Sequence, residues 1–215
     1  MHCIFFYFSI KESNVSVTLA CFAAGSLFTA FIEPLFFKRK VLWYEILFGL
    51  LVMGSLWMIF RVETRYTIGI ILGIAAALTS SVFGVMNGVL VQQGRSPSAV
   101  SFYEMLGGMI VMTLYIVLTE PMDGTLFRMS GESLFYLLVL GIVCTSVPFL
   151  IGIHILKAIS PYTVSLTLNL ETVYGIIFAY FIYNEYEQMT ATFYIGTLII
   201  LSTIFANAAL KRYLR

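Results

Sequence analysis

The stretch SPYTVSLTLNLETVYGIIFAYFIYNE, from Ser160 to Glu185, decides the fold. It is long and apolar enough to cross a bilayer, because a helix needs about 20 mostly apolar residues to span the hydrocarbon. It nevertheless carries Asn169 and Glu171 midway, where a carboxylate costs on the order of 2.5 to 3.5 kcal/mol. The three-and-four spacing of a helix puts the following residues on one side: Thr163, Thr167, Glu171, Tyr174, Gly175 and Phe178. We expect that side to face protein or water rather than lipid.

The composition of the whole chain points the same way. Hydrophobic residues make up 60% of the 215 residues and charged residues 11%, whereas charged residues are about a quarter of an ordinary soluble protein. We therefore predict an integral membrane protein with the lipid bilayer as its surroundings. The net charge of +1 and the lack of a basic stripe argue against nucleic acid as a partner. The three cysteines lie in apolar runs without metal-ligand spacing, so the sequence predicts no metal and no cofactor.

Seven long apolar segments follow a short apolar fragment at the N-terminus, and each is predicted to form a membrane-spanning helix. They cover residues 13–37, 41–60, 67–91, 99–118, 134–156, 161–183 and 192–210. The connections between them are short and polar, and we find no soluble domain or linker. The expected fold is an all-α polytopic membrane helix bundle.

Basic residues are divided unequally between the two faces of this predicted bundle. The richer face collects Lys38, Arg39, Lys40, Arg95, Lys157, Lys211, Arg212 and Arg215, and the poorer face has Lys11, Arg61, Arg65 and Arg128. Cytoplasmic loops of membrane proteins are enriched in Lys and Arg. We therefore expect the richer face and the C-terminus to be cytoplasmic, and the acidic loops 120–132 and 185–188 to be outside.

A weak internal repeat relates the two ends of the chain. A shift of roughly 147 positions pairs Ser13 with Ser160 and Gly49 with Gly196, and it pairs the basic Lys38 with the acidic Glu185, as opposite orientations in the membrane require. A unit that starts near residue 66 holds five spans, and an odd number of spans inverts the next copy. We predict residues 1–65 to be the remainder of a first repeat, incomplete by about 80 residues at its start, and 66–215 to be a complete second repeat.

These patterns resemble the drug/metabolite transporter superfamily, in particular its EamA-like permeases, which are built from two inverted five-helix repeats. The resemblance rests on SPYTVSLTLNLETVYGIIFAYFIYNE with the Gly196-containing helix after it, on NVSVTLACFAAGSLFTAFIEPLFFKRK and on GIILGIAAALTSSVFGVMNGVLVQQG. Thr172 stands where the family often has proline. The resemblance implies an inner-membrane carrier that exports amino acids, metabolites or drugs by alternating access, and it implies no particular substrate.

Glu33, Glu104 and Glu171 are acidic residues inside predicted spans. If all were ionised in apolar surroundings they would cost about 8 to 10 kcal/mol, comparable with the whole stability of a protein. They must therefore be protonated, paired or hydrated. A desolvated carboxyl group can exchange protons near neutral pH, which a proton-coupled carrier requires.

The first candidate substrate-binding residue is Glu171, with Asn169, Thr167 and Tyr174 nearby. Gly175 and the threonines are expected to leave space beside it; the alternative is a structural carboxyl group enclosed by neighbouring helices. Glu104 is a second candidate, on one face with Ser101, Gly107 and Gly108, where small residues permit close helix approach. Asn87, next to Gly88, is a separate candidate. Asn87 either lines the centre of the bundle or forms a hydrogen bond across a helix interface.

Glu33 is interpreted differently, because it precedes Pro34 and lies about one turn from Lys38. We expect its side chain to reach the cytoplasmic interface by snorkelling and to have a structural role. Pro148 is expected to kink its helix, with the hydroxyl groups of Thr145 and Ser146 accommodating the freed carbonyls.

Two functions from different classes remain open. The first is a secondary exporter of a small molecule, with its site at the membrane midplane between the repeats. The second is a truncated, non-transporting remnant or an accessory membrane subunit, in which a partner or a second copy, as in a homodimer, closes the bundle. An enzyme is not expected, because neither a paired nucleophile and base nor a ligand cluster is found.

Overall fold

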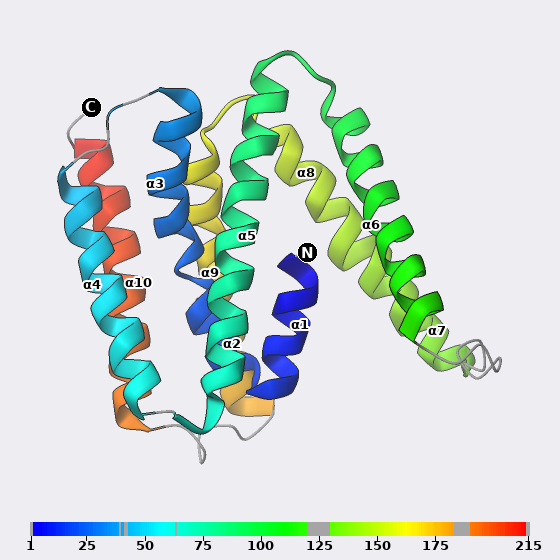
Figure 1. The fold of residues 1–215 in the computed structure, drawn as a ribbon. Helices are drawn as coiled ribbons and strands as arrows, with labels where there is room; N and C mark the ends of the chain where they lie inside the picture. Colours follow the sequence, from blue (N-terminus) through cyan, green and yellow to red (C-terminus); the bar gives the residue numbers. More distant parts are fainter. Residues whose placement is uncertain are drawn as a thin grey trace. The chain divides into compact units, whose positions relative to one another are not determined.

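The computed structural model describes residues 2–38, 40, 43–62, 64–119, 130–182 and 190–213. Within these ranges every regular element is helical, which confirms the predicted all-α class (Figure 1). The elements are α1 (His2–Glu12), α2 (Val15–Phe22), α3 (Gly25–Phe37), α4 (Trp43–Val62), η1 (Thr64–Tyr66), α5 (Thr67–Gln92), α6 (Pro97–Thr119), α7 (Gly131–Leu138), η3 (Val139–Ser146), α8 (Val147–Ile155), α9 (Pro161–Ile182) and α10 (Ala191–Tyr213).

Four segments of the described chain are long and apolar enough to cross a membrane, namely Val15–Phe37, Thr67–Gln92, Pro97–Leu118 and Gly131–Ile155. The remaining predicted spans coincide with α4, α9 and α10. Large apolar side chains point outward along these helices, as on α6, where Phe102, Met109 and Leu118 are exposed. Such a surface suits lipid rather than water. The acidic loops that the sequence places outside lie largely beyond the described residues.

The chain divides into two compact units. The first comprises Met1–Met86 and Ser160–Arg215, and the second comprises Asn87–Ile159. Helix α5 contributes its long N-terminal part to the first unit and its last turns to the second. The two units are defined by packing contacts and not by similarity of sequence. They do not test the predicted boundary between repeats at residue 65, which stays a prediction.

In the first unit, helices from the two ends of the chain pack against each other. Both α2 and α3 contact α9, and α4 lies beside α10 (Figure 1). Small side chains let the helices approach closely, as in other membrane bundles. The core of the unit is formed by Val17, Ala20, Cys21, Ala23, Ala24, Leu27, Val52, Ile70, Phe193 and Ile200.

The predicted span 13–37 is interrupted, which the sequence does not predict. Helix α2 ends at Phe22 and α3 begins at Gly25, with a short turn between them. The Leu27 N–H bonds the Ala24 carbonyl instead of the Ala23 carbonyl, and the Ser26 Oγ donates to the Ala23 carbonyl at 3.2 Å in its place. This bond allows a break at membrane depth, where an unsatisfied carbonyl would be costly. Just after the break, the Ser81 Oγ of α5 donates to the Gly25 carbonyl at 2.6 Å and joins α5 to the start of α3.

Helix α1 is joined to this bundle by a buried polar contact. The Ser9 side chain is fully buried, and its Oγ donates to the Gly69 carbonyl of α5 at 2.7 Å and lies 2.8 Å from the Thr18 Oγ1 of α2. The contact depends on Gly69, since a β carbon there would lie 2.5 Å from the Ser13 Cβ. The first residues therefore form part of the packed unit, although α1 is too short to span.

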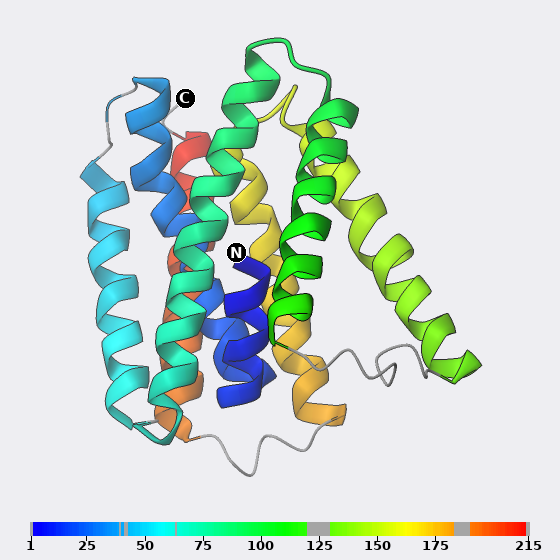
Figure 2. The ribbon, with the colours of Figure 1, turned by 45° about the vertical axis from the view of Figure 1, so that its right-hand side comes forward.

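The second unit is built from α6 and the continuous run of α7, η3 and α8, with α6 packed against α8 (Figure 2). The η3 segment is a π-helix that ends just before Pro148. The Thr145 Oγ1 donates to the Leu140 carbonyl at 2.8 Å, and the Ser146 Oγ donates to the Gly141 carbonyl at 2.7 Å. The structure thus has a widened π-helical turn before Pro148, in which hydroxyl groups bond the backbone, and the predicted kink at Pro148 itself stays a prediction.

Helix α2 approaches α9 closely at Gly175. A β carbon at Gly175 would overlap the Cδ1 of Leu19, whereas a β carbon at Gly54 of α4 would meet nothing within 4 Å. The two glycines therefore form a matched pair. Both lie inside helices, where alanine is normally favoured over glycine by about 0.5 to 1 kcal/mol.

We expect Gly175→Ala to lower the free energy of unfolding by about 1 to 3 kcal/mol, because the added methyl group overpacks the α2–α9 contact. Gly54→Ala should leave stability unchanged or raise it slightly. Reversible unfolding of both variants in mixed detergent micelles measures the difference. Equal effects of the two substitutions would show that α2 and α9 are not in close contact at Gly175.

Candidate functional site

The first group of predicted site residues lies on α9 in the first unit. Thr167, Glu171 and Tyr174 are all exposed there, and the Tyr174 side chain is 60% exposed. The Thr167 Oγ1 donates to the Thr163 carbonyl one turn earlier at 2.9 Å. The side chain of Asn169 lies outside the described residues. The structure thus presents a threonine, a carboxyl group and a tyrosine on the outer surface of one helix.

The space expected beside Glu171 is not where the sequence places it. The Leu19 side chain of α2 occupies the space next to the Gly175 backbone. The reason is that small residues in membrane helices are used for close backbone approach. The Gly175 position therefore provides no open space for a ligand.

The second group forms a direct contact in the second unit. The Asn87 Nδ2 on α5 donates to the Glu104 Oε2 on α6 at 3.3 Å. The Asn87 side chain is 3% exposed, and the Glu104 side chain is half-buried. Two residues that the sequence predicts separately are therefore partners across a helix pair.

Ser101 lies on the same helix as Glu104, one turn before it, although sequence reasoning treats it only as a small packing residue. It is 4% exposed. Neither its Oγ nor the Asn87 Oδ1 has a hydrogen-bond partner among the described residues. The signal in the sequence is the three-residue spacing of Ser101 and Glu104 on one helix face. Each of these two oxygens can accept a hydrogen bond from a donor-bearing ligand.

Glu33 does not snorkel to the interface, so that prediction is wrong. Its side chain is 4% exposed, and its Oε2 accepts a hydrogen bond from the Tyr162 backbone N–H at 2.7 Å. The physical reason is that the first turn of a helix has free N–H groups and a positive dipole end, which attract a carboxylate. The start of α9 supplies both within reach of α3.

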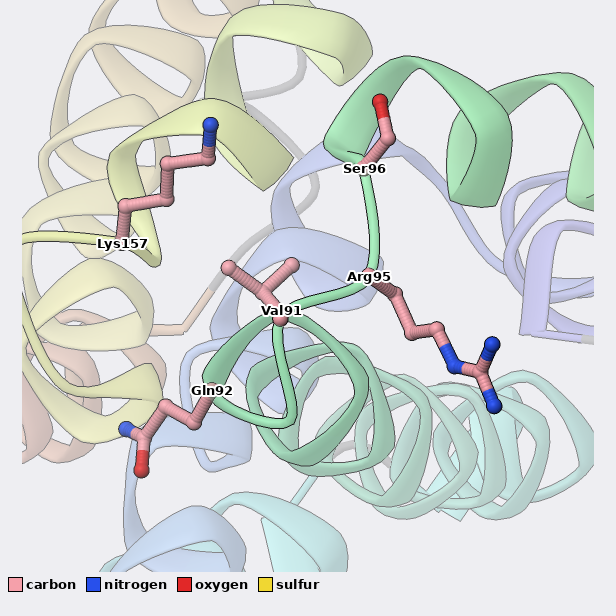
Figure 3. Close-up of a pocket in the computed structure, with 6 residues that line it drawn as sticks. Val91, Gln92, Arg95, Ser96 and Lys157 are labelled. Carbon is pink, nitrogen blue, oxygen red and sulfur yellow. The ribbon is translucent and has the colours of Figure 1, made fainter.

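A polar hollow of about 630 Å³ lies at one end of the second unit, lined by Val91, Gln92, Gly94, Arg95, Ser96 and Lys157. Figure 3 shows the Arg95 guanidinium turned away from Lys157, with Val91 between them. The two cationic groups therefore do not converge on one ligand position. No group of three or more His, Cys, Asp or Glu side chains that could hold a metal ion occurs in the described part of the chain.

The Asn87–Glu104 bond can be measured as a coupling energy. A double-mutant cycle with Asn87→Leu and Glu104→Met should give about 0.6 kcal/mol, and no more than about 1.7 kcal/mol, as for other hydrogen bonds between membrane helices. The matched control is a cycle of Asn87→Leu with Glu132→Gln, because Glu132 is exposed in the first turn of α7. Unfolding in mixed micelles reads out both cycles, and equal coupling in the two would contradict the contact.

Comparison with known protein families identifies the family of this chain. The family model of the EamA-like transporter family matches residues 67–208, which run from the start of α5 into α10 and include both Glu104 and Glu171. A search of curated proteins found no match, and a search of solved structures found none. The matched region is about two thirds of the chain and includes three of the four segments that are long and apolar enough to cross a membrane. The chain belongs to the EamA-like transporter family, and it is a multi-pass membrane protein of the transporter class.

Proposed function

We propose that the protein is a secondary transporter that exports a small metabolite, an amino acid or a drug by alternating access, and that it is proton-coupled. The observation that carries this proposal is the position of Glu104 and Glu171, one on each of two apolar helices within the matched family region. Substrate contacts are assigned to Glu171, Asn169, Thr167 and Tyr174 on α9, and to Glu104 and Asn87 on α6 and α5.

The exposure of Glu171 supports a role in transport. The described residues supply no hydrogen bond to its carboxyl group, and the side chain lies on the surface of the first unit. A carboxylate facing hydrocarbon would cost on the order of 2.5 to 3.5 kcal/mol or more. The free-energy cost is much smaller where the Glu171 carboxylate meets water. We therefore infer that the side of α9 with Thr167 and Tyr174 lines a water-filled path.

The arrangement of the first unit supports inverted repeats. A shift of roughly 147 positions puts Val15, the first residue of α2, on Tyr162, and Trp43, the first residue of α4, on Thr190. These positions are one residue from the starts of α9 and α10. Each helix also packs against its own counterpart, α2 on α9 and α4 on α10. Such pairing is what a two-fold axis between repeats produces, and it favours a site at the midplane.

Orientation follows from the basic residues. We infer an inner (plasma) membrane location with Lys38, Lys157 and the C-terminus on the cytoplasmic side. In this orientation α3 ends and α9 begins at the inner face. A homodimer is compatible with the exposed apolar helices, which can face lipid or a second copy.

The test is substrate-driven proton movement in proteoliposomes that enclose a pH-sensitive dye, with the proteinogenic amino acids as the first probe panel and cationic dyes as the second. We expect at least one probe to drive proton flux. Glu171→Gln should lower that flux about tenfold or more, which corresponds to about 1.4 kcal/mol or more of lost interaction. Glu132→Gln is the matched control, since Glu132 lies in the exposed first turn of α7.

Two results would count against these assignments. Unchanged flux and unchanged proton dependence in Glu171→Gln would remove Glu171 from the site. A chain that moves no probe, while retaining its helicity and a cooperative unfolding transition, would favour the accessory or non-transporting alternative.

A further inference from the structure

The contact between Glu33 and the start of α9 joins two segments that are 129 positions apart in the chain. Figure 1 shows the last turn of α3 and the first turn of α9 at the same end of the first unit. Both side chains are nearly inaccessible, with Glu33 4% and Tyr162 1% exposed. The 2.7 Å distance between the Glu33 Oε2 and the Tyr162 nitrogen is typical of a charge-assisted hydrogen bond.

The first turn of α9 shows why this bond matters. The residues of this turn are Pro161, which has no N–H, followed by Tyr162, Thr163 and Val164. The Thr163 N–H is bound by the Ser160 Oγ at 3.3 Å, and the Val164 N–H is bound by the Ser160 carbonyl at 3.1 Å. The Tyr162 N–H is thus the donor of the turn that is satisfied from another helix. Losing Glu33 would leave it buried and without this acceptor.

Helix α3 is well suited to move as a short segment. It begins after the break that follows Phe22, and it ends at Lys38, whose backbone is in the left-handed region with φ 51°. Pro34 lies inside it and cannot donate a helical hydrogen bond. The segment therefore has a discontinuity at its start, a weakened turn near its end, and the Glu33 bond where it meets α9.

We propose that Glu33 is a positioning residue for transport, whose bond to the Tyr162 N–H latches the end of α3 to the start of α9 and keeps that face of the bundle closed. This inference rests on the proposed alternating access, because such a carrier must open each face in turn. The latch holds α9, the helix that carries Glu171, Thr167 and Tyr174. Opening at the latched face requires the bond to break.

The latch is specific to one end of the bundle. The repeat shift of roughly 147 positions pairs Glu33 with Tyr180, which has no carboxyl group. The same shift pairs Tyr162 with Val15, whose helix α2 is capped locally by Asn14 through a 2.9 Å bond from the Val17 N–H. Both helix starts thus have a local side-chain cap, Asn14 in α2 and Ser160 in α9, and the contact that differs is the carboxylate of Glu33, which the repeat counterpart Tyr180 cannot supply.

The experiment compares Glu33→Met, which keeps the approximate size but removes the acceptor, with Glu33→Gln, which keeps an acceptor oxygen. The reporter is Ala30→Cys, one turn before Glu33 and 0% exposed, in a chain whose native Cys3, Cys21 and Cys144 are replaced by alanine. The control reporter is Ala76→Cys on α5, which is also 0% exposed. A membrane-impermeant maleimide is added separately to each face of oriented membrane vesicles.

We expect Glu33→Met to raise the labelling rate of the Ala30 reporter about tenfold or more, in line with the strength of a hydrogen bond to a charged group. The increase should occur from the Lys38 face alone. Glu33→Gln should stay within a few-fold of the parent, and the Ala76 reporter should not change in either variant.

An unchanged Ala30 rate in Glu33→Met would overturn the proposal. A rise that is equal at both reporters, or equal from both faces, would also overturn it, because it would show general loosening and not a latch. The labelling needs no substrate, so its outcome is independent of the proton-flux assay. A failed latch leaves the proposed transport standing, and a failed transport assay leaves the labelling result interpretable.

Discussion

The structure depends on one constraint, which is that every backbone polar group in hydrocarbon needs a partner within the protein. Regular helices meet it along most of the chain. The informative places are those where a helix is interrupted, because there the missing partner has to be supplied by a side chain. At the α2–α3 break Ser26 supplies it to the Ala23 carbonyl, and in the π-helical η3 segment Thr145 and Ser146 bond the Leu140 and Gly141 carbonyls.

The start of α9 is a third case, and it differs from the other two. The hydroxyl groups of Ser26 at the α2–α3 break and of Thr145 and Ser146 in η3 bond carbonyls three to five residues earlier in the chain, so those irregular turns are self-contained. Glu33 instead bonds an N–H of a distant helix. A self-contained bond stabilises an irregular shape in every state of the molecule, whereas a bond between two helices stabilises only the states in which those helices touch. That difference makes Glu33 a suitable element of a conformational equilibrium.

Much of the fold could be predicted from the sequence, because spanning helices are defined by apolar length, which is local information. The break between Phe22 and Gly25 could not, since its alanines favour a continuous helix and carry no interruption signal. Asn87 and Glu104 could each be chosen by type, but their contact depends on how α5 and α6 face each other. The sequence predicts that the Glu33 side chain reaches the nearest interface, because the free N–H groups at the start of α9 lie far away in the chain and local spacing does not reveal them.

The carboxyl groups of Glu33, Glu104 and Glu171 are satisfied to different degrees, and this ordering bears on function. Glu33 is buried and accepts a backbone N–H, and half-buried Glu104 accepts an amide from Asn87. Glu171 is exposed and has no hydrogen-bond partner among the residues described. Since an unsatisfied carboxyl group in a membrane is costly, its retention requires a compensating partner from outside the chain, either water, a proton or a solute. A carrier needs a group whose partner can be exchanged, and of the three carboxyl groups Glu171 is the one whose protein contacts leave it free for that exchange.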